Sequence, residues 1–160
     1  MEPLILHIPK KTIVGHCLDM SLVDNRTAEL FSGFMPHKAQ ITQAISQDVH
    51  EVMVYDALYF KQFNPNTRFQ KWAAVEVDAL FEVPEGMHTL SIDEGLYAVF
   101  TYKGLPQHFG SFMQSILTEW LPSSGYTLDH RPHINILGAS YKHNHPDSEE
   151  AVYIPIAPTR

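Results

Sequence analysis

Residues 95–104 read GLYAVFTYKG, and this stretch decides the fold. A run of apolar and aromatic residues between two glycines is typical of a strand buried in a sheet. Residues 106–121 follow with apolar side chains at helical spacing and Pro106 in the first turn, which predicts a helix. Residues 133–140 and 150–156 predict two more strands. The carboxyl-terminal part therefore predicts a strand–helix–strand–strand unit.

The same order of elements precedes this unit. Residues 4–22 predict a strand that Pro9 interrupts, because proline cannot donate a hydrogen bond to a neighbouring strand. Residues 24–45 predict a helix, capped by Asp24 or Asn25 and kinked by Pro36 near Met35. Two further strands are expected over residues 50–59 and 71–81.

These elements predict an α+β fold with two strand–helix–strand–strand repeats. The repeats form one curved antiparallel sheet with the two main helices on one face. We expect one domain over residues 1–160, with a first half over about 1–84 and a second over about 85–160, because Val83-Pro84-Glu85-Gly86 breaks the chain between them.

The composition excludes several classes of function. The formal net charge of −7 argues against direct nucleic-acid binding, which needs a basic surface. No apolar run is long enough to cross a membrane, and no secretion signal is visible, so we expect a cytoplasmic protein. A single cysteine, Cys17, excludes an internal disulfide and is expected to be a buried, unreactive thiol.

One candidate ligand site lies on the strand expected over residues 71–81. Trp72 and Glu76 are four residues apart and therefore point to the same face, with the small Ala74 between them. A large ring beside a carboxylate suits a flat cation, through stacking and charge attraction. The alternative is an ordinary solvent-exposed strand face.

A second group of candidates lies at the last strand. Glu149 shares a face with Tyr153, whereas Glu150 opens the apolar row on the other face and is expected to be more buried. Burial would raise the pKa of that carboxyl unless a cation compensates it. The alternative is a pair of solvated acids, and the sequence does not decide which glutamate faces a ligand.

Several aromatic rings could complete a ligand site. Tyr55 and Tyr97 are expected in the middle of strands, where a hydroxyl can orient a polar ligand atom. Phe63 lies in the loop over residues 60–70, which could fold over a cleft as a lid. The spacing of the ten histidines matches no metal motif, so neither a metal nor a cofactor is expected.

Five stretches carry a resemblance: GLYAVFTYKG (95–104), EWLPSSGY (119–126), DHRPHINIL (129–137), DSEEAVYIPI (147–156) and YFKQFNPNTRFQKWAAVEV (59–77). In order and spacing they resemble the GyrI-like small-molecule-binding domain, also called the bacterial transcription-activator effector-binding domain, in its stand-alone form. The resemblance implies two pseudo-symmetric halves and a ligand cleft between them on the concave sheet face. It also implies a buried glutamate among aromatic rings, in the terminal region of the chain.

The expected function is therefore a stand-alone binding protein that captures a hydrophobic, cationic or planar compound in that cleft. Two alternatives remain open at this point. The same pocket could hydrolyse strained, cyclopropane-type toxins, as some members of the family do. The protein could also modulate gyrase or act in transcription through another protein. A homodimer is possible, and an enzymatic role is the less favoured reading.

Overall fold

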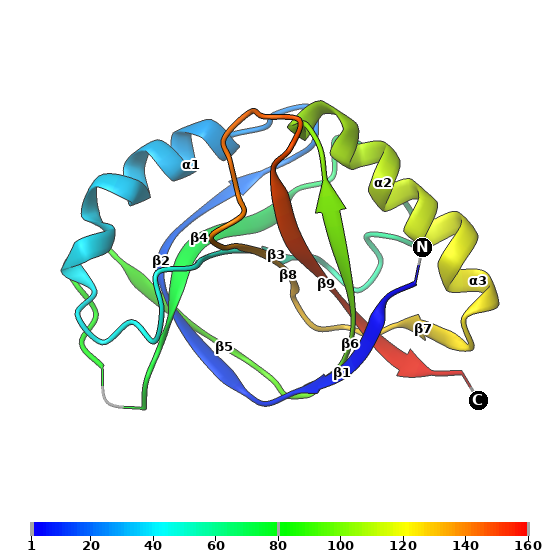
Figure 1. The fold of residues 1–160 in the computed structure, drawn as a ribbon, viewed down its shortest axis with the longest axis horizontal. Coiled ribbons are helices and arrows are strands. Elements are labelled where there is room, and N and C mark those ends of the chain that lie inside the picture. The colour runs from blue at the N-terminus through cyan, green and yellow to red at the C-terminus, as the bar shows by residue number, and fades with distance from the viewer. Residues whose placement is uncertain (1, 80, 160) are drawn as a thin grey trace.

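The chain folds into one curved antiparallel sheet that carries two helical segments on one face (Figure 1). We describe a computed structural model that covers residues 2–79 and 81–159. Within those residues the strand order is β1-β6-β9-β8-β3-β4-β2-β5, and β7 pairs with β9. The α+β fold class expected from the sequence is confirmed.

The strands are β1 (Leu4–Ile8), β2 (Lys11–Met20), β3 (Val49–Val54), β4 (Phe69–Val77), β5 (His88–Ile92), β6 (Gly95–Lys103), β7 (Tyr126–Leu128), β8 (His133–Leu137) and β9 (Glu149–Pro158). The helical segments are α1 (Thr27–Phe34), the 3₁₀ turn η1 (Met35–Gln40), the 3₁₀ turn η2 (Pro106–His108), α2 (Phe109–Ser115), the π turn η3 (Ile116–Trp120) and α3 (Leu121–Ser123). The segments from η2 to α3 follow one another directly along the second helical region.

Strands, helices or strand pairings end near three of the prolines. Pro9 separates β1 from β2, as expected. The α-helical part of the first helix ends at Phe34, and a 3₁₀ turn that contains Pro36 continues it only to Gln40. Residues 41–45 are therefore not helical, because Ile41 already has an extended backbone. Pairing of β9 with β8 stops at Tyr153, two residues before Pro155, whereas pairing with β6 continues to Pro155.

In the middle of the sheet β3 pairs with β8, from Val49 with Leu137 to Met53 with His133, and so joins the two repeats expected from the sequence. The edge strands are exchanged between the halves, since β1 pairs with β6 and β5 pairs with β2. The connections from β1 to β2 and from β5 to β6 are only two residues long. These short connections bring the two ends of the sheet together, so the sheet curls and its helix-free face becomes concave (Figure 1).

Three hydrophobic clusters stabilise this arrangement. Leu30 and Phe34 of α1 pack on β2, β3 and β4. Ile116, with the partly buried Trp120, packs on β6 and β9 at the other helical segment. The third cluster lies on the concave face, which we call the inner face, and joins residues from both halves, among them Trp72 and Tyr97. The other face is called the helix-covered face.

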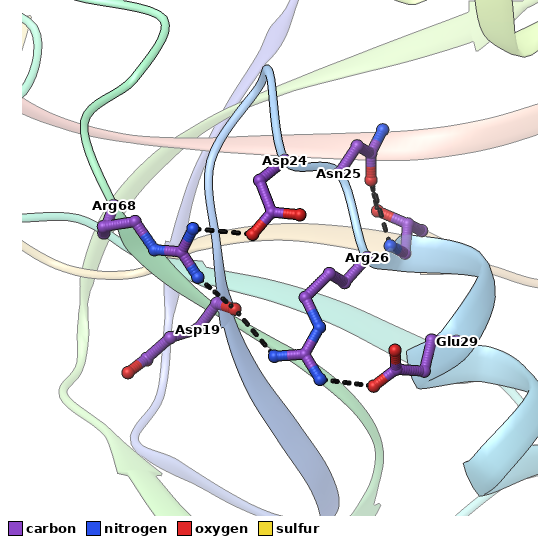
Figure 2. Close-up of polar contacts among 7 residues, drawn as sticks. Asp19, Asp24, Asn25, Arg26, Glu29 and Arg68 are labelled. Atoms are coloured by element: carbon purple, nitrogen blue, oxygen red, sulfur yellow. Dashed lines mark hydrogen bonds and ion pairs between the residues drawn. The ribbon is translucent and has the colours of Figure 1, made fainter.

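Polar contacts fix the connection between β2 and α1 (Figure 2). Arg68 pairs with Asp24 at 2.7 Å and donates to the backbone oxygen of Asp19 at 3.0 Å. Asn25 Oδ1 accepts a hydrogen bond from the backbone N–H of Thr27, the first residue of α1, at 3.0 Å. Asn25 thus accepts from the first amide of α1 from outside the helix, whereas the N-cap residue is Arg26 and forms no side-chain capping hydrogen bond.

Among the helices of residues 2–79 and 81–159, none has the length and hydrophobicity required to cross a lipid bilayer.

Candidate functional site

The inner face holds Trp72 and Tyr97 in a packed cluster. Trp72 is only 4% exposed, and its indole N–H donates to the Gln70 side-chain oxygen at 2.7 Å. The Tyr97 hydroxyl donates to the backbone oxygen of Pro132 at 3.1 Å, and the Arg131 guanidinium lies 4.6 Å from the ring centre. Burial raises the pKa of Tyr97, although the Arg131 charge opposes the rise. Both rings therefore fill the middle of the concave face.

Glu76 lies on the same face as Trp72, but its charge is balanced. Lys11 Nζ is 3.5 Å from Glu76 Oε1 and 3.2 Å from the Nε2 atom of His50. Burial, with the neighbouring Lys11 charge, lowers the pKa of His50 to about 4. The imidazole is therefore uncharged at neutral pH and can accept the Lys11 hydrogen bond.

An open cavity of about 410 Å³ lies next to this cluster, where β6, β8 and β9 meet the loop over residues 138–148. Three acidic residues, Asp48, Glu149 and Glu150, contribute to its lining, and the lining residues include no lysine, arginine or histidine. The other lining residues are small, apolar or hydroxyl-bearing: Thr101, Ile136, Gly138, Ala139, Ser140, Ala151 and Tyr153. Among the described residues, none of the three carboxylates forms an ion pair.

Tyr153 separates the cavity from the packed cluster. Its side chain lines the cavity and also packs against the residues around Trp72. The ring centre of Tyr153 is 6.1 Å from that of Tyr97, with the rings near perpendicular. The structure thus brings Glu149 and Tyr153 together at the cavity, with Trp72 behind Tyr153 on the same face.

Glu150 contributes to the cavity lining, but it belongs to the helix-covered face of the sheet. It is opposite Tyr102 on β6, and Tyr102 packs under α2 on the helix-covered face. Burial raises the pKa of Glu150 to about 7, the Glu51 carboxylate adds to the rise, and the Lys71 ammonium opposes it. Glu150 is therefore close to half-protonated at neutral pH.

A polar network lies beside Glu150. Glu51 accepts a hydrogen bond from the Asn135 amide at 2.9 Å and pairs with Lys71 at 3.5 Å. The carboxylates of Glu150 and Glu51 contribute to the rise in the pKa of Tyr141, after the larger effect of burial. These groups give Glu150 charged and hydroxyl neighbours on the helix-covered face.

Two of the residues selected from the sequence lie away from the inner face. Tyr55 is on the helix-covered face, where it packs against Phe69 and His133. Phe63 is 57% exposed in the loop between β3 and β4, with its ring edge toward Tyr59 at 6.0 Å. Neither residue touches the cavity lined by Glu149 and Tyr153.

The sequence analysis missed Asp48, Thr101 and Ser140 as cavity residues. Asp48 directly precedes β3, and its carboxylate lies beside Gly138 at the far end of β8. The sequence held no signal for this contact, because it follows from the pairing of β3 with β8, which the order of elements did not specify. Cys17 is only partly buried, rather than buried as expected, and burial raises its pKa, with a smaller contribution from Asp19.

The curved sheet with two helices and a cavity beside the last strand defines the chain as an α+β domain. The sequence profile of the GyrI-like small-molecule-binding domain matches residues 1–157. The chain belongs to this GyrI-like family.

Individual relatives agree with this assignment. The transcriptional regulator BrlR from Pseudomonas aeruginosa is 27% identical over 161 residues, which cover 98% of this chain. The chain spans about half of BrlR, 56% of its length.

Solved structures show the same fold. The structure of SAV2435 bound to tetraphenylphosphonium superposes with a TM-score of 0.65 at 13% identity, covering 98% of this chain and 94% of the other. A hydrolase encoded by lin2189 from Listeria innocua has a TM-score of 0.60 at 10% identity, covering 98% and 92%.

Proposed function

We propose that this protein captures a hydrophobic organic cation, planar or with several aromatic rings, in the cavity lined by Asp48, Glu149 and Tyr153. The observation that carries the proposal is a cavity of about 410 Å³ with Asp48 and Glu149 in its lining, neither of which forms an ion pair among the described residues. Cavities of this size are typical of small-molecule sites.

Charge and apolar surface both favour such a ligand. A delocalised organic cation is weakly hydrated, so it loses little on leaving water and gains attraction from the carboxylates. The Tyr153 ring offers a face for cation–π contact, and Ile136, Ala139 and Ala151 supply apolar wall. SAV2435, which shares this fold, was solved with tetraphenylphosphonium, a cation of this class.

The residues behind Tyr153 belong to the same proposal. Rotation of the Tyr153 side chain would join the cavity to the inner-face cluster, where Trp72 offers a larger ring. A cation that enters this far would compete with Lys11 for Glu76, since the two are 3.5 Å apart. Trp72, Glu76 and Tyr97 are thus proposed as a deeper part of the site that only larger ligands reach.

The test is calorimetric titration with two ions of the same shape and opposite charge. Tetraphenylphosphonium should bind, and tetraphenylborate should not, because the carboxylates repel it. Glu149→Gln should weaken tetraphenylphosphonium binding about fivefold to tenfold, the effect of losing about 1–1.4 kcal/mol. Glu85→Gln, on an exposed turn, removes the same charge elsewhere and should leave the affinity unchanged.

Equal affinity for the two ions would contradict the proposal. An unchanged affinity in both Glu149→Gln and Asp48→Asn would contradict it as well.

A second candidate is hydrolysis of a strained electrophile at Glu150, which lines the same cavity although its carboxyl lies toward the helix-covered face, and its pKa near 7 favours it. A carboxyl with that pKa can take a proton from water and return one at neutral pH. In the reaction the water oxygen bonds to a cyclopropane carbon and the ring C–C bond breaks. Its electron pair moves to the electron-accepting part of the compound, which takes the proton.

Mass spectrometry separates the two functions. Incubation of the protein with a cyclopropane-bearing alkylator yields the water adduct if the protein hydrolyses it. Capture without chemistry returns the compound intact, and Glu150→Gln should abolish turnover while it retains binding.

A further inference from the structure

A second cavity lies on the helix-covered face, at the opposite end of the central strands from the acidic cavity. It measures about 200 Å³ and lies between the turn after β3 and the segment that leads into β8. The two cavities share no lining residue. The hydrogen bond between the His130 ring and the backbone oxygen of Tyr55, at 3.2 Å, joins the two segments that form it.

Aromatic rings form the deep wall of this cavity. Phe60 stacks on His133 with ring centres 5.2 Å apart, and Tyr55 meets the His133 ring edge-on at 5.0 Å. Tyr59 and Phe69 pack behind Tyr55 at 4.5 and 5.1 Å. These contacts hold the wall rigid, so the space in front of it is a preformed slot beside flat rings.

His133 is the polar group of this wall. His133 lines the cavity and is only 5% exposed. Neither of its ring nitrogens has a hydrogen-bond partner among the described residues. Burial lowers its pKa to about 3, so the ring is uncharged at neutral pH. An uncharged imidazole presents one N–H donor and one acceptor nitrogen. Neither His133 nitrogen is among the fully buried polar atoms without a partner, so a molecule in the cavity can reach them.

The charges at the mouth cancel. The lining includes two cations, Lys61 and the buried Arg131, and two carboxylates, Asp56 and Asp129. Arg131 pairs with Asp129 at 3.1 Å and donates to the backbone oxygens of Leu96 and Ile156 at 2.7 and 3.2 Å, whereas its Nη1 atom is buried without a hydrogen-bond partner among the described residues. The two cations and two carboxylates sum to no net charge, so charge alone favours neither an anion nor a cation.

We propose that this cavity is a second binding site, for a small, flat, uncharged heteroaromatic molecule whose N–H donates to His133. Tyr55 and Phe60 supply the apolar walls, and His133 supplies the acceptor that orients the ligand. The site is separate from the acidic cavity in position and in ligand charge. The protein can therefore hold two ligands of different chemistry at once, one on each face of the sheet.

The test is NMR titration of protein labelled with ¹⁵N-histidine, with benzimidazole at pH 7.5 as the probe. Benzimidazole is flat and uncharged at this pH and carries one N–H. Binding should shift the His133 ring nitrogens saturably. 1-Methylbenzimidazole keeps the shape and lacks the donor, so it should bind about fivefold to tenfold more weakly, the effect of one lost hydrogen bond.

Two variants assign the site. Ala57→Trp places a large ring at the exposed mouth without removing a buried group, and it should abolish the shift while the melting temperature stays unchanged. His133→Phe keeps the stacking with Phe60 and should remove the difference between the two benzimidazoles. Tetraphenylphosphonium binding should be unaffected by Ala57→Trp.

The absence of a saturable shift at millimolar benzimidazole would overturn the proposal. Undiminished binding to Ala57→Trp would also overturn it, because the probe would then occupy another place. Since the readout is a histidine that the acidic cavity does not contain, these results do not depend on the cation-binding proposal.

Discussion

Replacing Glu150 with glutamine should remove a pH-dependent loss of stability. Burial and the Glu51 carboxylate raise the pKa of Glu150 from 4.5 to about 7. In the unfolded chain this carboxyl ionises at its ordinary pKa, so between about pH 4.5 and 7 folding takes up a proton. Stability must therefore fall as the pH rises through this window and level off above it.

The size of the effect follows from the same shift. A tenfold change in an ionisation equilibrium is worth about 1.4 kcal/mol, which gives an upper limit of about 3 kcal/mol for Glu150. Glu150 is only partly buried, and solvent screening reduces this to about 2 kcal/mol. Glutamine resembles the protonated acid in shape and cannot ionise, so Glu150→Gln should escape this loss.

The assay is urea unfolding of both proteins from pH 5 to 8.5, followed by circular dichroism. The free energy of unfolding of Glu150→Gln relative to wild type should rise by about 1.2 kcal/mol across that range, because the rest of the total of about 2 kcal/mol is already lost at pH 5, above the unfolded pKa of 4.5. Histidine titrations occur in both proteins and cancel in the difference. Glu85→Gln is the control for the loss of one surface charge. Parallel curves for wild type and Glu150→Gln would refute the reasoning.

Three further changes test the packing and the charges. Phe34→Ala empties a fully buried position under α1 and should cost about 3–5 kcal/mol of unfolding free energy, measured by urea unfolding. Gly15→Ala places a Cβ 2.6 Å from the Ala74 Cα and closer still to the Ala73 carbonyl oxygen. The strands β2 and β4 must then separate, which should lower the melting temperature. A melting temperature within about 2 °C of wild type would contradict this. Lys11→Met removes the positive charge beside His50 and should raise the His50 pKa above about 4, which NMR titration of the ring measures.

The sequence predicted the architecture because the two helical patterns and the strand order are local signals. Pro9 and Pro36 broke their elements at the expected places, since a proline lacks the backbone N–H that a strand or helix uses there. The sequence did not predict β7, because a strand of three residues carries no periodicity. It also extended the first helix over residues 41–45, where apolar spacing continues without helical backbone.

For the candidate site, the sequence could predict only which side chains share a face of the same strand, because side chains alternate between the two faces. That rule placed Trp72 on the same face as Glu76, and Glu149 on the same face as Tyr153, but did not decide whether Glu149 or Glu150 faces a ligand. It could not show that Lys11, from another strand, pairs with Glu76, or that Asp48 lies beside Gly138. Such contacts depend on strand register and sheet curvature, which arise from long-range packing rather than from local sequence.

A crystal structure of the protein with tetraphenylphosphonium tests the central claim most directly. The cation should lie in the cavity beside Glu149, Asp48 and Tyr153, with a phenyl ring against the Tyr153 side chain. Finding the ion on another surface of the protein, with the acidic cavity unchanged, would contradict the account.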